Sequence, residues 1–557
     1  MNAVLFRWIV AVLTALAVLA PVGLVVYQAF LSGPFFQPST RFSLAAFSFV
    51  FSDPDFWDAF WNSLILAVGM ALIAAPIGSL LAFLVTRTDL PGRGWLEPIV
   101  LIPIFLSPLV LAFGYVVALG PVGFLSTLAI DLFDDVPWNL YSMTALVLIA
   151  GLTHVPHVYL YAAAALRSLG ADLEEAARTT GAGPWRVALD VSLPMVSPAI
   201  LYGAVLVFFL GFEVFGLPLI LGDPQGLLVL STYLFKLTNK LGVPSYQLMA
   251  VVVMVIIAVA LPLVALQRYL LRASQRYVAV RGKAARARLL PLGRWRWPAA
   301  ALILAWFGFT VAIPLAGLVL RSFVTSWGVG VRLSEVLTLS NYTGLLDHPT
   351  DPIRAIVNTL LIGTLGGALA VAAYAAIALA QHRWNSGWAR LLDGLVMLPR
   401  AMPGLVAGLA MLWLFLFVKP LSPLRQTLFS IWLAYTLVWL AYGLRLIQAS
   451  LVQVGGELEE AARTTGASEG RAMRDVTLPL IRYGLLASWL LIFLIFVREY
   501  STGVYLLAPG TEVIGSLLVS LWGTGAVELV TALAVANVAI LVVGLAVAFR
   551  LGVCLHG

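Results

Sequence analysis

A ten-residue segment, Leu-Glu-Glu-Ala-Ala-Arg-Thr-Thr-Gly-Ala, occurs twice in this chain, at Leu173–Ala182 and at Leu458–Ala467. Each copy is followed at the same distance by a Leu-Pro pair, Leu193-Pro194 in the first case and Leu478-Pro479 in the second. The two copies are separated by about half of the 557 residues, so the repeat predicts a fold built of two similar halves.

The composition places most of this chain in contact with lipid. Hydrophobic residues make up 61% of it and charged residues 11%, whereas soluble domains average about 25% charged residues. The net charge of +7 is concentrated in a few short loops, as in the cytoplasmic loops of membrane proteins, and this argues against nucleic-acid binding. The single cysteine, Cys554, excludes an intrachain disulfide and a cysteine-based metal cluster.

Twelve apolar stretches reach the roughly 20 residues that a helix needs to cross a bilayer. We therefore predict an all-α membrane protein with about twelve transmembrane helices in two homologous halves. The first stretch follows Arg7 and is predicted to be retained, because it is long for a signal-peptide core and lacks a small-x-small cleavage site. The predicted spans are 8–30, 61–85, 97–119, 142–166, 195–221, 247–269, 298–320, 356–380, 393–418, 428–450, 480–507 and 526–549.

A basic segment between the halves predicts the orientation of the chain. It contains nine Arg or Lys residues and no Asp or Glu, which places it in the cytoplasm by the positive-inside rule. An even number of spans then places both termini and both copies of the repeated segment on the cytoplasmic side. Contact with lipid headgroups is a further role that fits this segment. The basic residues are Arg268, Arg272, Arg276, Arg281, Lys283, Arg286, Arg288, Arg294 and Arg296.

The similarity of the halves extends beyond the repeated segment. Asn62-Ser63 opens one predicted span and Asn358-Thr359 opens its counterpart, and Pro103 and Pro108 correspond to Pro399 and Pro403. Repeated prolines predict bent helices along a central cavity, since the freed backbone groups need protein or water nearby. The predicted organisation is 1–57 as a first helix with its loop, 58–270 as one domain, 271–297 as the basic linker, 298–355 as the seventh helix with its loop, and 356–550 as a second domain.

Each repeated segment is predicted to form a short helix with a face of small residues. Glu174 and Arg178 are four residues apart, a spacing that favours an ion pair along the helix, as for Glu459 and Arg463 in the second copy. Asp172 is predicted to cap the first helix with Glu175 as its partner. Gly181 and Gly466 are expected to end the helices in a left-handed conformation. Small side chains suit a narrow groove on a soluble partner, while a loop that merely covers the helix bundle is the alternative.

At this point the sequence resembles the membrane subunits of binding-protein-dependent ABC importers. Their pattern, Glu-Ala-Ala-x3-Gly-x9-Ile-x-Leu-Pro, is matched in both copies, with Val191 and Val476 in place of Ile. The resemblance covers nearly the whole chain as two fused permease domains of the type I importer fold. The matching residues are Glu175, Ala176, Ala177, Gly181, Leu193 and Pro194 in the first copy, and Glu460, Ala461, Ala462, Gly466, Leu478 and Pro479 in the second.

The resemblance implies a mechanism and partners. Each loop is expected to be a coupling helix seated on a cytoplasmic ABC ATPase subunit, present as two copies, and a periplasmic substrate-binding protein is expected on the other side. The chain has no Gly-x4-Gly-Lys-Ser/Thr phosphate loop, so ATP and Mg are expected on the ATPase and no cofactor on this chain. The protein is thus expected to be a multi-pass transport subunit of the bacterial inner membrane, with no catalytic residues of its own.

Charged residues inside predicted spans are costly and mark candidate sites on a transport path. Glu213 occupies such a position in one half, and Arg498-Glu499-Tyr500 lies at a nearly matching position in the other. Two interpretations stay open for Glu499: a structural pair with Arg498, or a path residue in contact with a cationic or oxygen-liganded cargo. No metal-ligand set can be assigned from the sequence.

The segments Arg498–Tyr500 with Leu506–Gly515, and Arg276–Lys283, resemble permeases of ferric-iron importers and, after these, of thiamine importers. Ferric iron prefers oxygen ligands, which suits a route lined by Glu and Tyr. Importers of thiamine, polyamines or organophosphonates are alternatives with the same coupling pattern. A different class, an ion-coupled secondary transporter, also has twelve spans in two halves, but it leaves the two repeated loops unexplained.

Overall fold

The computed structural model describes residues 3–169, 172–239, 245–276, 289–347, 351–382, 384, 386–399, 402 and 404–550. Within these residues the regular elements are helices, accompanied by isolated β-bridges. The chain forms two compact units, which we describe separately. The first-half unit comprises Val50–Pro244 and Val255–Leu337, and the second-half unit comprises Met1–Phe49, Ser245–Met254 and Thr338–Gly557. The predicted all-α fold is confirmed.

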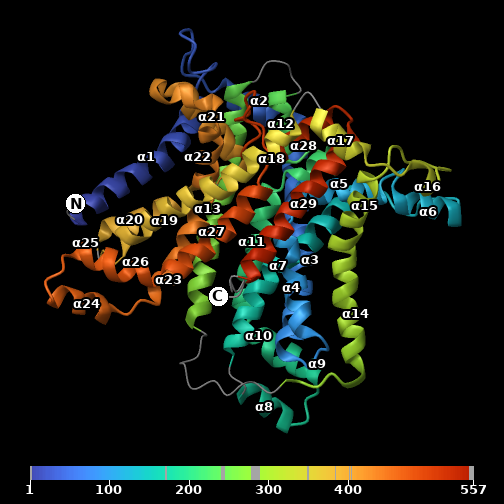
Figure 1. The fold of residues 1–557 in the computed structure, drawn as a ribbon, viewed down its shortest axis with the longest axis horizontal. Coiled ribbons are helices and arrows are strands. Elements are labelled where there is room, and N and C mark those ends of the chain that lie inside the picture. Colours follow the sequence, from blue (N-terminus) through green and yellow to red (C-terminus); the bar gives the residue numbers. More distant parts are fainter. Residues whose placement is uncertain are drawn as a thin grey trace. The chain divides into compact units, whose positions relative to one another are not determined.

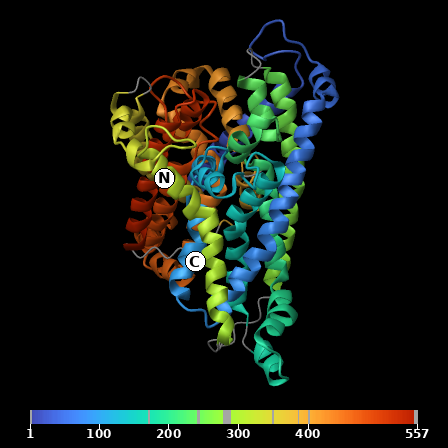
Figure 2. The ribbon, with the colours of Figure 1, turned by 90° about the vertical axis from the view of Figure 1, so that its right-hand side faces the viewer.

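The first-half unit is built around long helices that run side by side, as blue α3 and teal α7 do in Figures 1 and 2. Helices α2 (Ala45–Ser52) and α13 (Tyr246–Arg276) each contribute to both units. The other elements of this unit are α3 (Pro54–Arg87), α4 (Arg93–Phe105), α5 (Pro108–Leu119), α6 (Phe124–Phe133), α7 (Met143–Ser168), α8 (Asp172–Thr179), α9 (Pro184–Val187), η1 (Ala188–Ser192), α10 (Leu193–Met195), α11 (Ser197–Glu213), η2 (Pro218–Gly222), η3 (Asp223–Gln225), α12 (Leu230–Asn239), η4 (Gly293–Trp295), α14 (Arg296–Phe307), η5 (Gly308–Ala312), α15 (Ile313–Ser322) and α16 (Leu333–Val336).

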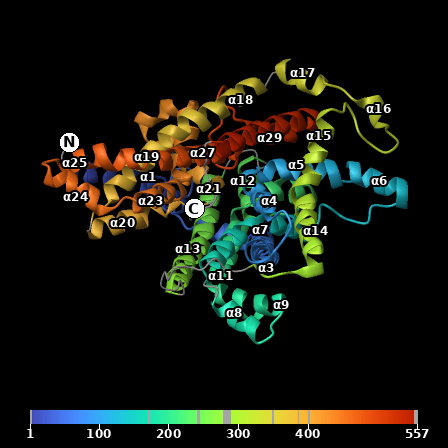
Figure 3. The ribbon, with the colours of Figure 1, turned by 60° about the horizontal axis from the view of Figure 1, so that its bottom comes forward.

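The second-half unit has a comparable order of elements after its first helix, and Figure 3 shows α19, α23 and α27 within it. Its elements are α1 (Ala3–Ala29), α17 (Ser340–Asp347), α18 (Pro352–Leu361), η6 (Ile362–Gly366), α19 (Gly367–Gln381), α20 (Gly387–Val396), α21 (Gly404–Phe417), η8 (Lys419–Gln426), α22 (Leu428–Val438), α23 (Leu440–Val452), α24 (Gly456–Thr464), α25 (Glu469–Ala472), η9 (Met473–Thr477), α26 (Leu478–Leu480), α27 (Arg482–Arg498), α28 (Ile514–Gly523) and α29 (Val527–Arg550).

The described residues contain eight helices long and apolar enough to cross a membrane, or up to eleven if each of three bent pairs is one span. The predicted spans 195–221, 428–450 and 480–507 correspond to the bent pairs. The predicted span 393–418 is interrupted, because α20 ends at Val396 and α21 begins at Gly404. Residues 400, 401 and 403 of that interruption, and residues 277–288 of the predicted basic linker, lie outside the described part of the chain.

The repeated prolines predict a bend in the span 97–119, whereas in the first-half unit Pro103 lies inside α4 and Pro108 begins a new helix. The predicted span 97–119 is divided into α4 and α5 because the backbone is extended at Leu106 and Ser107, and Pro108 then occupies the first position of α5. Proline lacks an N–H group and disfavours a helical conformation in the residue before it, so the chain breaks here and restarts. The corresponding Pro403 lies outside the described residues.

Glycines allow the helices of the first-half unit to approach backbone to backbone. A Cβ atom at Gly78 of α3 would lie 2.9 Å from the carbonyl oxygen of Val155 in α7. One at Gly211 of α11 would overlap the Cα atom of Ala67 in α3. Small residues at such crossings permit close van der Waals packing, which is a main source of helix association in lipid. The contacts of α3 with α7 and α11 therefore depend on these glycines.

The first helix of each half packs with helices encoded by the other half. Helix α1 belongs to the second-half unit, where it packs on α19, α20 and α21, and Trp8 makes edge-on ring contacts with Trp384 and Trp388. Helices α14 and α15 belong to the first-half unit, where α15 packs on α5 and Pro314 meets Gly114. Sequence order alone does not predict this exchange.

The Gly211→Ala change is expected to destabilise the first-half unit by about 1–3 kcal/mol, because the added methyl group overlaps backbone that cannot move aside. The apparent Tm of the detergent-solubilised protein should fall by several degrees. Gly23→Ala is the matched control, since a Cβ atom at Gly23 in α1 meets nothing within 4 Å. Equal Tm values for the two variants would show that the α3–α11 contact is not tightly packed.

Candidate functional site

Both repeated segments fold as the same helix-and-turn unit, which we call the coupling loops. In the first-half unit α8 is followed by Gly181, whose φ is +86°, and in the second-half unit α24 is followed by Gly466, whose φ is +93°. The N–H of Gly181 donates to Arg178 O and that of Gly466 to Arg463 O, each at 3.0 Å. Only glycine adopts this backbone at little cost. The predicted left-handed ends are confirmed, and α8 and α24 lie beyond the long helices of their own units in Figures 1 and 3.

The repeated glutamate and alanines face outward from each unit. Glu175 and Ala176 are exposed, as are Glu460 and Ala461, while the alanine that follows in each copy is half-buried. A Cβ atom at Gly181 or Gly466 would meet nothing within 4 Å. Each coupling loop therefore presents a shallow surface of small side chains with one carboxylate, and the chain itself leaves this surface uncovered within each unit.

The preceding glutamate of the first coupling loop points inward. Glu174 Oε1 accepts a hydrogen bond from Ser192 Oγ at 2.8 Å and lies 3.3 Å from Arg87 Nε at the end of α3. The side chains of Arg87 and Glu174 are each only 4% exposed. The predicted helical ion pair of Glu174 with Arg178 is wrong, because the carboxylate is turned toward the membrane helices instead. The predicted Asp172 cap concerns a side chain outside the described part of the chain.

The second coupling loop repeats this arrangement with a different basic side chain. Glu459 Oε1 accepts a hydrogen bond from Thr477 Oγ1 at 2.6 Å and lies 2.9 Å from His382 Nε2 at the end of α19. Arg7 of α1 pairs with Glu469 of α25 and also donates to His382 O at 3.4 Å. In both units a buried carboxylate therefore joins the coupling loop to the end of a membrane helix.

The equal spacing of the two Leu-Pro pairs corresponds to a bend in the chain. Pro194 lies in α10, after which the helix axis turns by 72° into α11, and Pro479 lies in α26, after which it turns by 65° into α27. The bend separates each coupling loop from the membrane span that it precedes. These prolines therefore lie where the surface helix meets the span, and their predicted contact with an ATPase subunit stays a prediction.

The intramembrane charges lie where the bent spans end. Helix α11 ends at Glu213 and α27 ends at Arg498, so the spans predicted to reach residues 221 and 507 stop earlier. In the first half Pro218 cannot donate a helical hydrogen bond, and the chain continues as a short π-helical turn. In the second half the side chain of Glu499 accepts hydrogen bonds from nearby donors, and these take the place of the backbone hydrogen bonds of a continued helix.

The carboxylate of Glu499 is held by four hydrogen bonds. Its Oε1 accepts from Ser501 Oγ at 2.9 Å and from the N–H and hydroxyl of Thr502 at 3.2 and 3.1 Å, and its Oε2 accepts from Trp439 Nε1 at 3.1 Å. Trp439 stands at the 60° bend between α22 and α23. All four donors are neutral, and the Arg498 guanidinium lies 5.9 Å from the Trp439 ring centre. Glu499 thus connects two interrupted spans.

Small residues make room for this loop. A Cβ atom at Gly408 of α21 would overlap the carbonyl oxygen of Thr502, and one at Gly404 would overlap Ser501 Oγ. Tyr500 is buried, and its Cβ leaves no space for a side chain at Gly515. The unwound segment after α27 is therefore packed against backbone rather than left open to lipid, as the hydrocarbon core requires.

In the first half, the predicted Asn62-Ser63 pair ties down the chain after the break. Asn62 Nδ2 donates to Leu228 O at 3.0 Å, and Ser63 Oγ accepts from the N–H of Leu230, the first residue of α12, at 2.8 Å. Nearby, Tyr233 donates to Asp53 at 2.6 Å, and burial together with this hydrogen bond raises the pKa of Tyr233, so the phenol stays protonated as a donor.

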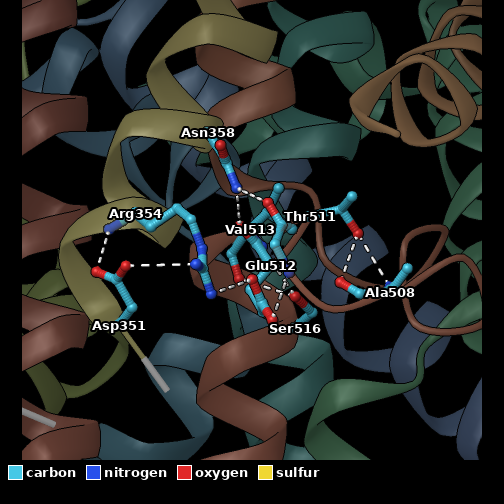
Figure 4. A network of polar contacts seen from close by, with 9 residues as sticks. Asp351, Arg354, Asn358, Ala508, Thr511, Glu512, Val513 and Ser516 are labelled. Atoms are coloured by element: carbon cyan, nitrogen blue, oxygen red, sulfur yellow. Dashed lines mark hydrogen bonds and ion pairs between the residues drawn. The ribbon is translucent and has the colours of Figure 1, made fainter. Parts of the chain in front are cut away.

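The Asn358-Thr359 pair does the same in the second half. Asn358 Nδ2 donates to Gly510 O at 3.1 Å and Glu512 O at 2.8 Å, and Thr359 Oγ1 accepts from the N–H of Ile514, which begins α28, at 2.9 Å. Figure 4 shows Asn358 above the Glu512 segment. The repeated dipeptide therefore fastens the segment after each break to the start of a span.

A charged cluster extends this second tie. Arg354 lies 3.2 Å from Glu512 Oε2 and 3.5 Å from Asp351 Oδ2, and these contacts are drawn in Figure 4. Among the described residues, no group of three or more His, Cys, Asp or Glu side chains is placed to hold a metal ion.

Sequence reasoning identifies the outward residues of the coupling loops but misses the inward ones. It pairs Glu174 and Glu459 with cations along their own helices, and it does not connect Arg87 or His382 with either loop. A usable signal is present: Ser192 and Thr477 are hydroxyl residues at the same distance after the two copies of the repeat. The basic partners Arg87 and His382 are far away in sequence, and only the fold brings them to the loops.

The comparisons with known proteins agree with this geometry. The family model "Binding-protein-dependent transport system inner membrane component" matches residues 74–276 and 369–556, which together are more than half of the chain. A Haemophilus influenzae protein named as a putative ferric transport system permease, FbpB 1, is 24% identical over 459 residues, covering 81% of this chain and 70% of that protein.

Two further relatives are similar to this chain, one over most of its length and the other over a shorter stretch. The ferric transport system permease protein FbpB of Actinobacillus pleuropneumoniae is 24% identical over 462 residues, 81% of this chain and 65% of its own length. The molybdenum transport system permease protein ModB of Escherichia coli is 32% identical over 167 residues, 30% of this chain and 72% of its own. The chain therefore belongs to the family of binding-protein-dependent transport system inner membrane components and carries two such domains of the type I permease fold in one multi-pass membrane polypeptide.

Proposed function

We propose that two copies of a separate cytoplasmic ABC ATPase subunit dock on the two coupling loops, and that their closure on ATP and Mg drives the permease. The observation that carries this proposal is the duplication: two loops of equal sequence and equal geometry present the same exposed Glu-Ala-Ala surface. The docking residues are those of the repeated pattern, from Glu175 to Pro194 and from Glu460 to Pro479. ATP hydrolysis then takes place on the partner, since the chain has no phosphate-loop motif.

The contacts within each unit support the predicted orientation. In the second-half unit, Arg7 near the N-terminus pairs with Glu469 beside the second coupling loop. In the first-half unit, the N–H of Leu290, at the end of the basic linker, donates at 2.8 Å to the carbonyl oxygen of Arg87, which also lies beside Glu174. We therefore place both coupling loops, the N-terminus and the linker in the cytoplasm of a bacterial cell, and a periplasmic binding protein on the opposite side.

We place the substrate route along the two breaks, at Glu213 in one half and at Arg498, Glu499 and Tyr500 in the other. Non-helical backbone at membrane depth is tolerated only where it is buried in protein or lines a water-filled cavity. The carboxylate of Glu499 stabilises one such break through its four hydrogen bonds. Glu499 then contributes to transport in two ways: it maintains the conformation of the break that lines the route, and it presents a negative charge there.

Ferric iron is the cargo that the comparisons favour. Two relatives that match 81% of this chain are named as ferric transport permeases. A second candidate is an oxyanion, since ModB, named for molybdenum transport, is more similar over a shorter stretch. The oxygen-rich break around Glu499, Ser501 and Thr502 suits a hard cation better than an anion.

Uptake by proteoliposomes that hold the chain, its ATPase and its binding protein distinguishes these cargoes. We expect ATP-dependent uptake of radioactive Fe(III), with no uptake of molybdate or thiamine under the same conditions. Uptake of molybdate alone would replace iron by an oxyanion while leaving the importer assignment intact. Full uptake without nucleotide, driven by an ion gradient, would refute the importer mechanism.

The double variant Gly181→Leu and Gly466→Leu is expected to lose copurification with the ATPase subunit. A leucine at these positive-φ sites strains the turn and adds bulk to a surface that otherwise has only small side chains. Gly226→Leu with Gly330→Leu is the matched control, because both glycines also have positive φ and a Cβ atom at either would meet nothing within 4 Å. If the coupling-loop variant retains its partner and its transport rate, the docking surface lies elsewhere.

The Glu499→Gln change is expected to lower uptake by about tenfold while leaving ATPase copurification unchanged. The amide offers one acceptor oxygen where the carboxylate has two, so the bonds to Trp439 and to Ser501 and Thr502 cannot all persist. Loss of hydrogen bonds to a charged group typically costs about 1.5–3 kcal/mol. Glu335→Gln, at an exposed position of α16, serves as control, and uptake equal to that of the control would exclude Glu499 from the route.

A further inference from the structure

Two separate places in the fold show the same unusual arrangement. In each, a glutamate of the coupling helix is turned inward, accepts a hydrogen bond from a hydroxyl at the base of the following span, and meets a basic side chain at the end of another span. The first set is Glu174, Ser192 and Arg87, and the second is Glu459, Thr477 and His382. We call each set a carboxylate latch.

The burial of the first latch makes it a firm connection. Arg87 and Glu174 have side chains that are 4% exposed, and Arg87 Nη2 also donates to Leu169 O at 2.7 Å, just before the coupling loop. Removing a partner from a buried ion pair leaves an uncompensated charge, which is strongly unfavourable. The loop and the end of α3 are therefore expected to move together rather than to slide past each other.

The second latch connects more elements. His382 and Glu459 have side chains that are 15% and 11% exposed, and Arg7 adds a contact from α1 to the carbonyl oxygen of His382. Since Arg7 also pairs with Glu469, helix α1, the end of α19 and both short helices of the second coupling loop meet at one place. The basic group differs between the latches, but the carboxylate and the hydroxyl have the same positions in the repeat.

We propose that Glu174 and Glu459 are positioning residues that transmit the movement of the coupling loops to the ends of α3 and α19. This inference rests on the proposed function, because it needs an ATPase that moves the loops. The outward Glu175 and Glu460 hold the partner, and the inward Glu174 and Glu459 hold the membrane helices. The first glutamate of each repeat thus serves transmission and the second serves docking. Because the chain bends after each Leu-Pro pair, each latch is a second connection between the coupling loop and the membrane helices, in addition to the chain itself.

The test is the double variant Glu174→Gln and Glu459→Gln in proteoliposomes with the ATPase and binding protein. We expect copurification of the ATPase within twofold of the unmodified protein, ongoing ATP hydrolysis, and uptake per ATP hydrolysed lowered by about tenfold, within the usual range of coupling between sites. Glu457→Gln, an exposed carboxylate on the same helix α24, is the matched control and should leave this ratio unchanged.

Two further variants separate transmission from simple loss of stability. His382→Arg restores the kind of cation found in the first latch and should keep the ratio of uptake to hydrolysis, whereas His382→Ala should lower it. Ser192→Ala with Thr477→Val removes only the hydroxyl donors and should also lower the ratio of uptake to hydrolysis. This variant tests the proposal if the glutamine variant does not accumulate.

The outcomes are distinct. An unchanged ratio in the glutamine variant, or in the hydroxyl variant if only that one accumulates, overturns the latch proposal. Loss of ATPase copurification, or an equal fall of uptake and hydrolysis, also overturns it, because the carboxylates would then serve docking or stability. If the unmodified protein shows no ATP-dependent uptake with its partners, the proposed function fails instead.

Discussion

The constraint on which this structure depends is that lipid offers no hydrogen bonds to an interrupted helix. The chain interrupts its spans after Glu213 and after Arg498, so every exposed backbone group there needs a partner from the protein. Beyond the first break, Asn62 and Ser63 bond the backbone of Leu228 and Leu230, and beyond the second, Asn358 and Thr359 bond that of Glu512 and Ile514. Glu499 adds a carboxylate at the second break. The interruptions are therefore built features of the fold.

The two halves place the residues around the coupling glutamate at corresponding positions but use different basic side chains. Ser192 and Thr477 both supply a hydroxyl to the coupling glutamate, while the basic partner is Arg87 in one unit and His382 in the other. Arginine stays charged at any physiological pH, whereas histidine offers hydrogen bonding in both protonation states. A duplicated geometry with unequal chemistry therefore gives the two coupling loops different basic contacts inside their own units.

Exchange of helices gives each unit parts from both halves of the sequence. Helix α1 reaches the second coupling loop through Arg7 and Glu469, and α14 and α15 complete the unit that contains the first. Such an exchange makes neither half of the chain a self-sufficient unit.

Much of this could be predicted from the sequence because the determining patterns are local. Apolar length predicted the membrane helices, the repeat predicted two halves with matching loops, and Gly181 and Gly466 predicted left-handed helix ends. Pro103 and Pro108 predicted a bent helix in the first half, where the structure has a break before Pro108. These features depend on backbone stereochemistry and hydrophobicity within a few residues, and both properties can be read from residues that are adjacent in sequence. The length of each span was less well predicted, because the breaks after Glu213 and Arg498 depend on partners from other helices.

Only the tertiary structure decided which way the adjacent glutamates of each coupling loop point. From sequence, Glu174 has an obvious partner in Arg178, four residues away; in the fold, Arg87 and Ser192 lie closer and are shielded from water. A buried charge selects the partners that complete its hydrogen bonding, and these come from whatever helices pack beside it. The sequence thus determined that two similar loops accompany twelve apolar stretches, while tertiary packing determined which side chains the glutamates of those loops contact.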